Sequence, residues 1–406
     1  MHAFRHLLGM RGVRPLLIAS SFPRLAYAMV SLSIFFLVED ATGNLGYAGL
    51  AVGVSSALGA LTAGPRGLLV DRYGQTLPIL VMTPAYALSC LALAFFAHSV
   101  PTAIVLAGLV GVCAPPINLS IRPLWQELVG AEHVRTAYSL DSAWMNMIQL
   151  IGPVLATAIA LRVSPTVAIV TVGGCMLVGG LLLAINPHSR AWVPEARHEG
   201  EHGLMRSPAM RLMGLEAVAM GLSMGFVTIG IPALATEQGR QGSTGWLLAA
   251  GGLGAIIGTA WAGARAKHVA PAPGLRMSTL LYAIALVPLP FLPIGPAMFV
   301  VLLVAYAFLG PAHVYYLETI DIVRPRGTAV AALGSLWMIE GAATGVGNAI
   351  GGSVAQSWGP HLTLALGCVA VIGSPLVLTV GLRSVLRPAM RPPITPQVPR
   401  VNDLSA

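Results

Sequence analysis

The sequence contains little charge for its length. Only 9% of its 406 residues are Asp, Glu, Lys or Arg, whereas about 25% is usual for a soluble domain. Hydrophobic residues make up 56% of the chain, and the mean hydropathy is +0.78. A disordered chain would be polar and charged, so this composition excludes disorder. The excess of apolar side chains predicts helices that face the hydrocarbon of a lipid bilayer.

Lysine occurs once, at Lys267, between Ala266 and His268. A phosphate-binding P-loop ends in Gly-Lys-Ser/Thr, so the sequence excludes ATP hydrolysis by that route. A proton or solute gradient is then the expected driving force, and no cofactor is predicted. Cysteine is also scarce, and the four cysteines lie in apolar stretches without metal-ligand spacing. We therefore predict buried thiols and no metal site.

Apolar runs of membrane-spanning length recur along the chain. A helix needs about 20 such residues to cross the hydrocarbon core. The sequence therefore predicts an all-α membrane protein with twelve transmembrane helices. The expected spans lie near residues 15–38, 45–70, 77–97, 101–122, 136–161, 164–186, 210–234, 244–265, 276–292, 295–317, 327–357 and 361–382.

Basic residues are distributed unevenly between the two sides of these spans. Most of the 23 Lys and Arg residues fall on the side that carries both termini, while Arg162 and Arg240 fall on the other. Cytoplasmic loops are enriched in Lys and Arg, so both termini are expected in the cytoplasm. The net charge of +8 then reflects membrane topology, and no nucleic-acid partner is predicted.

A polar stretch from residue 186 to 211 separates six spans from six. Residues 135–145 and 326–338 resemble each other, and each segment follows a span that contains a proline. Internal repeats of transporters leave weak similarity of this kind. We therefore predict an N-terminal six-helix bundle at 1–186, a cytoplasmic loop at 187–209, a C-terminal six-helix bundle at 210–385 and a cytoplasmic tail at 386–406.

The most specific motif is Gly67-Leu-Leu-Val-Asp71-Arg72-Tyr-Gly74, at the end of the second predicted span. It resembles the signature loop of the major facilitator superfamily, Gly-x-Leu-x-Asp-Arg-x-Gly-Arg-Arg/Lys, although the final basic pair is absent here. Gly67 allows close helix contact, and Gly74 allows a tight turn. In that family the loop latches the outward-facing conformation closed on the inner side. The resemblance therefore implies a cytoplasmic gate at Gly67, Asp71, Arg72 and Gly74.

The resemblance covers the whole chain and includes features of actinobacterial drug and metabolite exporters. It implies two pseudo-symmetric six-helix bundles that act as a monomer in a bacterial inner membrane, with a small molecule as substrate. Gly152-Pro153 in the fifth span is similar to the core of a motif of proton-linked exporters, and equally suits a simple helix kink. The expected function is proton-coupled export by alternating access, that is, efflux by antiport.

Two alternatives remain open on sequence alone. One is uptake or facilitated diffusion of a nutrient by the same fold, because no residue decides the direction of transport. The other is a non-transporting membrane receptor or assembly subunit. An intramembrane enzyme is not expected, since the spans contain no paired catalytic aspartates and no histidine cluster.

Ionisable side chains within spans are costly and indicate functional sites. Glu340 lies past the midplane of the eleventh span, about 18 Å from its start at 1.5 Å per residue. Hydrocarbon favours the neutral form of a carboxyl, which suits a proton carrier, and a structural hydrogen bond is the alternative role. Arg24 in the first span is expected either to hold an anionic substrate group or to pair with a carboxylate.

Four further polar residues complete the predicted coupling and substrate site. Arg122 and Asp141 lie near the cytoplasmic ends of consecutive spans and are expected to form an ion pair. Asn146 and Gln149 share a helix face at i, i+3 spacing and are predicted to line the cavity or to bond to a neighbouring helix. Glu216 follows the start of its span by little more than one turn, so we expect it to reach water.

Overall fold

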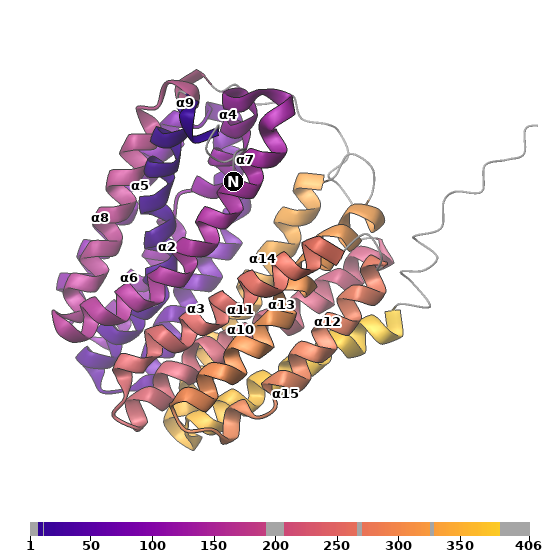
Figure 1. Ribbon diagram of the computed structural model, residues 1–406. Helices are drawn as coiled ribbons and strands as arrows, with labels where there is room; N and C mark the ends of the chain where they lie inside the picture. The colour runs from indigo at the N-terminus through magenta and orange to yellow at the C-terminus, as the bar shows by residue number, and fades with distance from the viewer. Residues whose placement is uncertain (1–6, 11, 192–206, 266–269, 325–328, 382–406) are drawn as a thin grey trace, which may run out of the picture.

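The computed structural model describes residues 7–10, 12–191, 207–265, 270–324 and 329–381. Within these ranges the chain is almost entirely α-helical (Figure 1). The helices of the first half are α2 (Val13–Thr42), α3 (Leu45–Leu61), α4 (Ala63–Tyr73), α5 (Thr76–Phe96), α6 (Val100–Cys113), α7 (Ile117–Arg162), α8 (Pro165–Ala184) and α9 (Pro187–Ala191). Those of the second half are α10 (Pro208–Glu237), α11 (Thr244–Arg265), α12 (Pro271–Leu286), α13 (Pro296–Val323), α14 (Ala329–Trp358) and α15 (Pro360–Gly381), with short 3-10 turns at Gln241–Ser243 and Leu289–Phe291.

The described helices confirm an all-α membrane fold. Nine segments of the described chain are long and apolar enough to cross a bilayer. Two shorter apolar helices, α3 and α6, take the places of the second and fourth predicted spans. Helix α14 takes the place of the eleventh. Each predicted span therefore corresponds to helical structure.

Short turns with specific caps join the helices. At the turn after α2, Gly43 adopts a left-handed conformation with φ 61°, which costs glycine little. The next residue, Asn44, caps α3 by accepting a hydrogen bond from the backbone N–H of Tyr47 at 3.1 Å. Ser99 and Ser164 cap α6 and α8 in the same way. These signals fix where each helix begins.

Two predicted spans are interrupted in the structure. Helix α6 ends at Cys113 rather than near residue 122, because Pro115 and Pro116 follow and a proline lacks the N–H that would continue the helix. The chain is helical again from Ile117 and stays so to Arg162, through residues that were predicted to form a loop. The span predicted at 45–70 is divided between α3 and α4 at Thr62.

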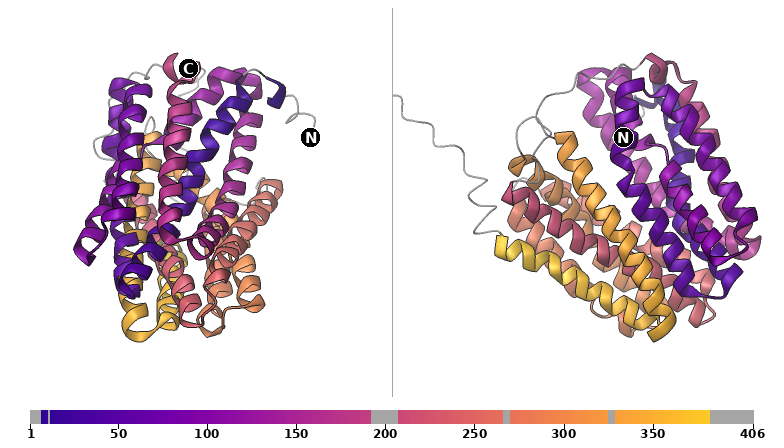
Figure 2. Two further views of the ribbon diagram at one scale, coloured as in Figure 1. Left: turned by 90° about the vertical axis from the view of Figure 1, so that its left-hand side faces the viewer. Right: turned by 180° about the vertical axis from the view of Figure 1, so that it is seen from behind.

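The helices form two bundles with matching internal contacts (Figures 1 and 2). In the first bundle α2 packs on α7 and α8, and α3 packs on α6. In the second, α10 packs on α14 and α15, and α11 packs on α13. These are equivalent pairs when the two halves are aligned in chain order, as expected for a structural repeat.

The predicted boundary between the halves falls on residues that the structure describes only in part. Of the loop predicted at 187–209, helix α9 and the first residues of α10 are described, and residues 192–206 lie outside the described chain. The tail predicted at 386–406 also lies outside it. The buried hydrophobic clusters nevertheless follow the two bundles, since one is drawn almost wholly from the first half and the two others come from the second half.

Candidate functional site

The two bundles meet closely along α3 and α14. A Cβ atom added to Gly53 would lie 2.5 Å from the carbonyl oxygen of Gly345, and one added to Gly49 would lie 2.5 Å from the Cα of Gly352. Real Cβ atoms do not approach backbone atoms this closely. Glycine at these positions therefore lets the two helix backbones touch, as small residues do in membrane helix pairs.

Polar contacts extend this junction at the face where α2 turns into α3, which we call the sealed face. The backbone N–H of Leu45 donates to the Gln356 side chain across the junction at 2.8 Å. Gln241 donates to the carboxylate of Glu39 at 3.4 Å. A second helix pair joins the halves: α11 packs on α7, where Gly245 lies against Pro153. The halves are therefore joined by two symmetry-equivalent helix pairs at the sealed face.

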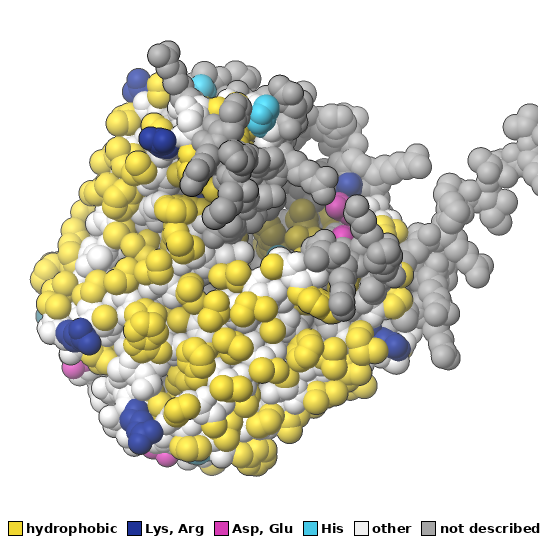
Figure 3. Space-filling view, viewed as in Figure 1, with side chains coloured by type: hydrophobic (Ala, Val, Ile, Leu, Met, Phe, Trp, Pro, Cys, Tyr) yellow, Lys and Arg dark blue, Asp and Glu magenta, His cyan; other side chains and the backbone are white. Residues whose placement is uncertain are grey.

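The halves separate at the other face, which we call the basic face. Its helix ends carry the exposed side chains of Arg72, in the last turn of α4, and Arg190, in α9. The ribbons of the two bundles diverge toward this end (Figure 1). A space-filling view shows the surface hollowed between them there (Figure 3). The molecule is thus closed across one face and open at the other.

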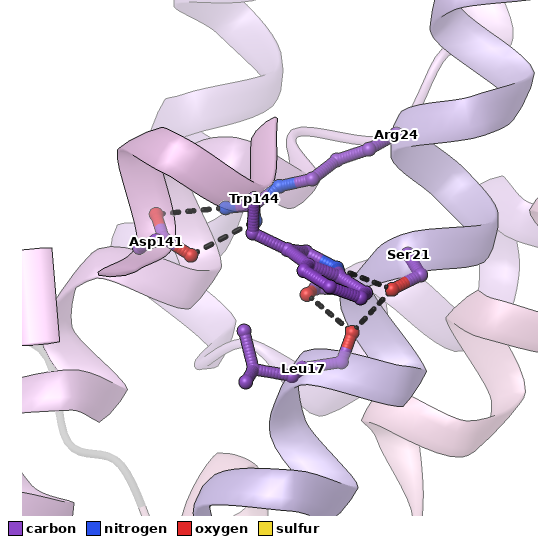
Figure 4. A network of polar contacts seen from close by, with 6 residues as sticks. Leu17, Ser21, Arg24, Asp141 and Trp144 are labelled. Atoms are coloured by element: carbon purple, nitrogen blue, oxygen red, sulfur yellow. Dashed lines mark hydrogen bonds and ion pairs between the residues drawn. The ribbon is translucent and has the colours of Figure 1, made fainter. Parts of the chain in front are cut away.

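A buried ion pair joins α2 to α7 in the first bundle (Figure 4). The two guanidinium nitrogens of Arg24 lie 2.8 Å and 2.9 Å from the two carboxylate oxygens of Asp141. Their side chains are only 4% and 10% exposed. One turn along α7, Trp144 donates from its indole nitrogen to the hydroxyl of Ser21 on α2 at 2.7 Å. Arg24 therefore pairs with a carboxylate, one of the two roles expected for it.

The partner of Asp141 differs from the expected one. The sequence predicted an ion pair between Arg122 and Asp141, but the carboxylate is bound in a bidentate manner by Arg24. Both Arg122 and Asp141 lie on α7, and the side chain of Arg122 is outside the described part of the structure. Helix α2 crosses beside α7 and brings Arg24 to Asp141, a proximity that spacing along the chain does not reveal.

The Arg24–Asp141 pair predicts a specific pattern of stability. Arg24→Gln leaves a buried carboxylate without its partner, and we expect a loss of about 3–5 kcal/mol in unfolding free energy. The double variant Arg24→Gln with Asp141→Asn is expected to recover much of that loss, because no charge is then left unpaired. Thermal unfolding of the purified single and double variants measures this coupling. Strictly additive losses would contradict the pairing.

A second polar cluster lies in the other bundle and contains two carboxylates. Glu216 of α10 is 3% exposed and accepts a hydrogen bond from the hydroxyl of Ser374 on α15 at 3.1 Å. Glu340 of α14 is half-buried and lies near enough to Glu216 for their charges to interact. Tyr316 of α13 is close to both, and its buried hydroxyl has no hydrogen-bond partner in the described structure. No salt bridge of the described residues involves either carboxyl group.

Glu216 is therefore a correction to the sequence-based expectation. Its position near the start of α10 suggested that it would reach water, but side chains of α13 and α15 cover it. The close approach of α10 to α14 explains its proximity to Glu340, because a Cβ on Gly221 would lie 2.3 Å from the backbone oxygen of Glu340. Glu340 thus has an acidic neighbour that was not predicted.

The other predicted site residues lie apart from these clusters. On α7, Asn146 is half-buried and Gln149 is exposed. In the gate motif, Gly67 lies within α4, and Gly74 ends that helix with φ 74°. Arg72 is exposed and stacks over the ring of Tyr73 at 5.3 Å, while the side chain of Asp71 lies outside the described structure. The motif is therefore at the basic face, where the two bundles are apart.

Comparisons with known proteins agree with this architecture. The sequence profile of the Major Facilitator Superfamily matches residues 16–339. An uncharacterized MFS-type transporter, y4rN, of Sinorhizobium fredii (strain NBRC 101917 / NGR234) is 22% identical over 417 residues, which cover 97% of this chain and 98% of that protein.

Solved transporters share the fold at low sequence identity. The nucleoside transporter NupG superposes with a TM-score of 0.73 at 9% identity, over 92% of this chain and 100% of its own. A peptide transporter, POT, in complex with sulfate superposes with a TM-score of 0.71 at 15% identity, over 93% and 95%. Together with the profile that covers most of the sequence, this architecture shows that the chain is a multi-pass membrane transporter of the Major Facilitator Superfamily.

Proposed function

We propose that the protein is a proton-coupled exporter of a small organic molecule that works by alternating access. The observation that carries this proposal is the acidic cluster of Glu216 and Glu340, which lies within apolar helices and has no basic partner among the described residues. Glu216 is buried and Glu340 is half-buried, and their neighbouring carboxyl groups repel when both are charged, so binding of a proton relieves the repulsion.

The second part of the proposal concerns orientation. We place both termini in the cytoplasm of a bacterial cell and the protein in its inner membrane, on the basis of the positive-inside distribution. The basic face is then cytoplasmic, and the structure represents an inward-facing state. In the opposite state the basic face closes and the sealed face opens, with α3–α14 and α7–α11 as the junctions that part.

Direction of transport separates this proposal from its alternative. Uptake or facilitated diffusion would use the same fold, and the solved relatives are described as nucleoside and peptide transporters. Export is favoured only by the Gly152-Pro153 sequence in α7, where a Cβ on Gly152 would lie 2.3 Å from the Cβ of Ala28 on α2. Counterflow in vesicles of known orientation decides between the two.

The experiment that tests proton coupling uses proteoliposomes with a pH-sensitive dye inside. A wide panel of small organic solutes is added, and the internal pH is followed. We expect one or more solutes to move protons in proportion to their own transport, and a protonophore to abolish solute accumulation. Solute movement without any proton flux would overturn the coupling, and absence of any transport would favour a receptor or assembly subunit.

The gate motif supplies a prediction about the closed cytoplasmic state. Asp71→Asn removes the charge that the family resemblance assigns to the inner latch, so we expect the inward-facing population to increase severalfold. A single cysteine replaces Tyr73, and a membrane-impermeant thiol reagent is added at the basic face. The measurement is the rate at which the reagent labels this cysteine. Leu77→Asn, at an exposed residue near the start of α5 and outside the motif, is the control. Equal labelling of Asp71→Asn and the parent protein would remove the latch role.

A further inference from the structure

A cavity of about 320 Å³ lies inside the first bundle, apart from both polar clusters. It is bounded by α2, α3, α4, α5 and the break between α6 and α7. Its walls include the apolar side chains of Val30, Ile34, Val52 and Val110. Pockets that bind small molecules are mostly apolar with a few polar groups, and their volumes begin near 300 Å³. The size fits a molecule with a single small ring.

The cavity contains a buried positive charge. Arg66 lines it and is only 8% exposed. The guanidinium donates to backbone carbonyls of Thr62 at 3.0 Å and Gly111 at 3.4 Å, and also to those of Gly59 and Ala114. It therefore covers the carbonyl groups that α6 exposes where the prolines end it. From the sequence it counted only as one more basic residue of the cytoplasmic side.

Among the described residues, no carboxylate pairs with the charge of Arg66. Carbonyl groups are dipoles and leave a net charge of one, and no salt bridge of the described residues involves Arg66. An uncompensated buried charge is costly. A ligand with one negative group would provide the missing counter-charge, whereas a cation would be repelled.

A second group in the cavity lacks a partner. Tyr86 of α5 lines the cavity, is 1% exposed, and its hydroxyl makes no hydrogen bond to the described residues. The other tyrosine of the wall, Tyr27, donates to the carbonyl of Pro115 and is satisfied. Buried hydroxyl groups are nearly always hydrogen-bonded, so the unpaired hydroxyl of Tyr86 points to an acceptor that a ligand supplies.

We propose that this cavity binds the carboxylate of a small aromatic or aliphatic acid, with Arg66 as its counter-charge and the Tyr86 hydroxyl as its hydrogen-bond donor. The inference rests on the proposed transport function, because it names the substrate class.

The wall of the cavity also reaches the junction between the bundles, where Asn348 of α14 donates to the Ser56 hydroxyl at 3.4 Å. Glu340 lies two turns earlier on the same helix. A ligand in the cavity would therefore contact a wall that is hydrogen-bonded to α14, the helix that carries Glu340.

The test is thermal unfolding of the purified full-length protein with benzoate, phenylacetate and hexanoate, each compared with its neutral amide. We expect at least one acid to raise the Tm saturably, and the amides to give no shift. Arg66→Gln should abolish the shift. Tyr86→Phe should weaken binding about tenfold, the loss expected for one hydrogen bond to a charged group. Tyr282→Phe alters a buried tyrosine of the other bundle and should leave binding unchanged.

The outcomes separate binding from transport. If Arg66→Gln only lowers the Tm and no acid stabilises the parent protein, Arg66 is a helix-end cap and the proposal fails. Equal stabilisation by acids and amides, or an unchanged affinity in Tyr86→Phe, would also overturn it. Because Tyr86→Phe removes a single unpaired hydroxyl, it tests the site even if Arg66→Gln does not fold. None of these readouts requires proton coupling, so failure of the proposed export mechanism would be seen separately.

Discussion

Glu340→Gln is expected to abolish proton-driven transport, with at least a hundredfold loss of solute-dependent proton flux. Glutamine keeps the shape and hydrogen-bonding capacity of the side chain but cannot carry a titratable proton. The fold should remain, because Glu340 makes no salt bridge among the described residues. Counterflow of solute in the absence of a proton gradient should persist. That combination would separate a coupling role from a structural one.

Two further variants sharpen this prediction. Glu216→Gln is expected to reduce proton flux as well, since Glu216 is buried beside Glu340 and shares its charge environment. Glu237→Gln, at the exposed end of α10, is the matched control and should behave as the parent protein. Proteoliposomes with internal pH recorded provide the measurement. Full proton flux in Glu340→Gln would exclude this residue from the mechanism.

Gly53→Leu is expected to prevent closure of the sealed face and to reduce transport more than tenfold. A side chain at this position meets the carbonyl oxygen of Gly345 at 2.5 Å and the backbone nitrogen of Ala349 at 2.8 Å. Backbone atoms cannot move aside as a flexible side chain does, so α3 and α14 must separate. The protein would then be held with its halves apart at this face.

Accessibility of the junction measures that separation. Asn348 is 1% exposed at the interface, so Asn348→Cys should be protected from an impermeant thiol reagent in the parent background. Adding Gly53→Leu should raise the labelling rate at least tenfold. Gly174→Leu is the control, because a Cβ at this helical glycine of α8 meets no atom within 4 Å. Unchanged protection in Gly53→Leu would mean that the glycine contact does not close this face.

Much of the fold could be predicted from the sequence because the solvent is hydrocarbon. A helix in hydrocarbon must form its backbone hydrogen bonds internally and present apolar side chains to the lipid. Long apolar runs therefore indicate membrane spans directly. The interruption of the fourth span was less visible. Pro115 and Pro116 are in the sequence, but tolerance of proline in membrane helices made a kink as reasonable as the observed break after Cys113.

The polar sites were only partly predictable. The position of a residue along its own span does not show which residues of other helices it contacts. Glu340 and Arg24 were singled out as ionisable groups within spans, and the structure has Arg24 buried and Glu340 half-buried. Their partners, Glu216 and Asp141, come from helices that are far apart in the chain. Arg66 was overlooked for the same reason, since nothing in its local sequence indicates that the guanidinium turns inward onto the end of α6. Tertiary contact, and not periodicity, decides such pairs.

We expect the two bundles to alternate between closure at one face and closure at the other. Distances between spin labels test it most directly in a cysteine-free background, with one pair at Tyr73 and Ile322 of the basic face and another at Tyr47 and Trp358 of the sealed face, all of which are exposed. The distances are measured at low and at high pH. We expect the distance across the basic face to shorten under the condition in which the distance across the sealed face lengthens. A single unchanged distance at both faces under every condition would contradict the account.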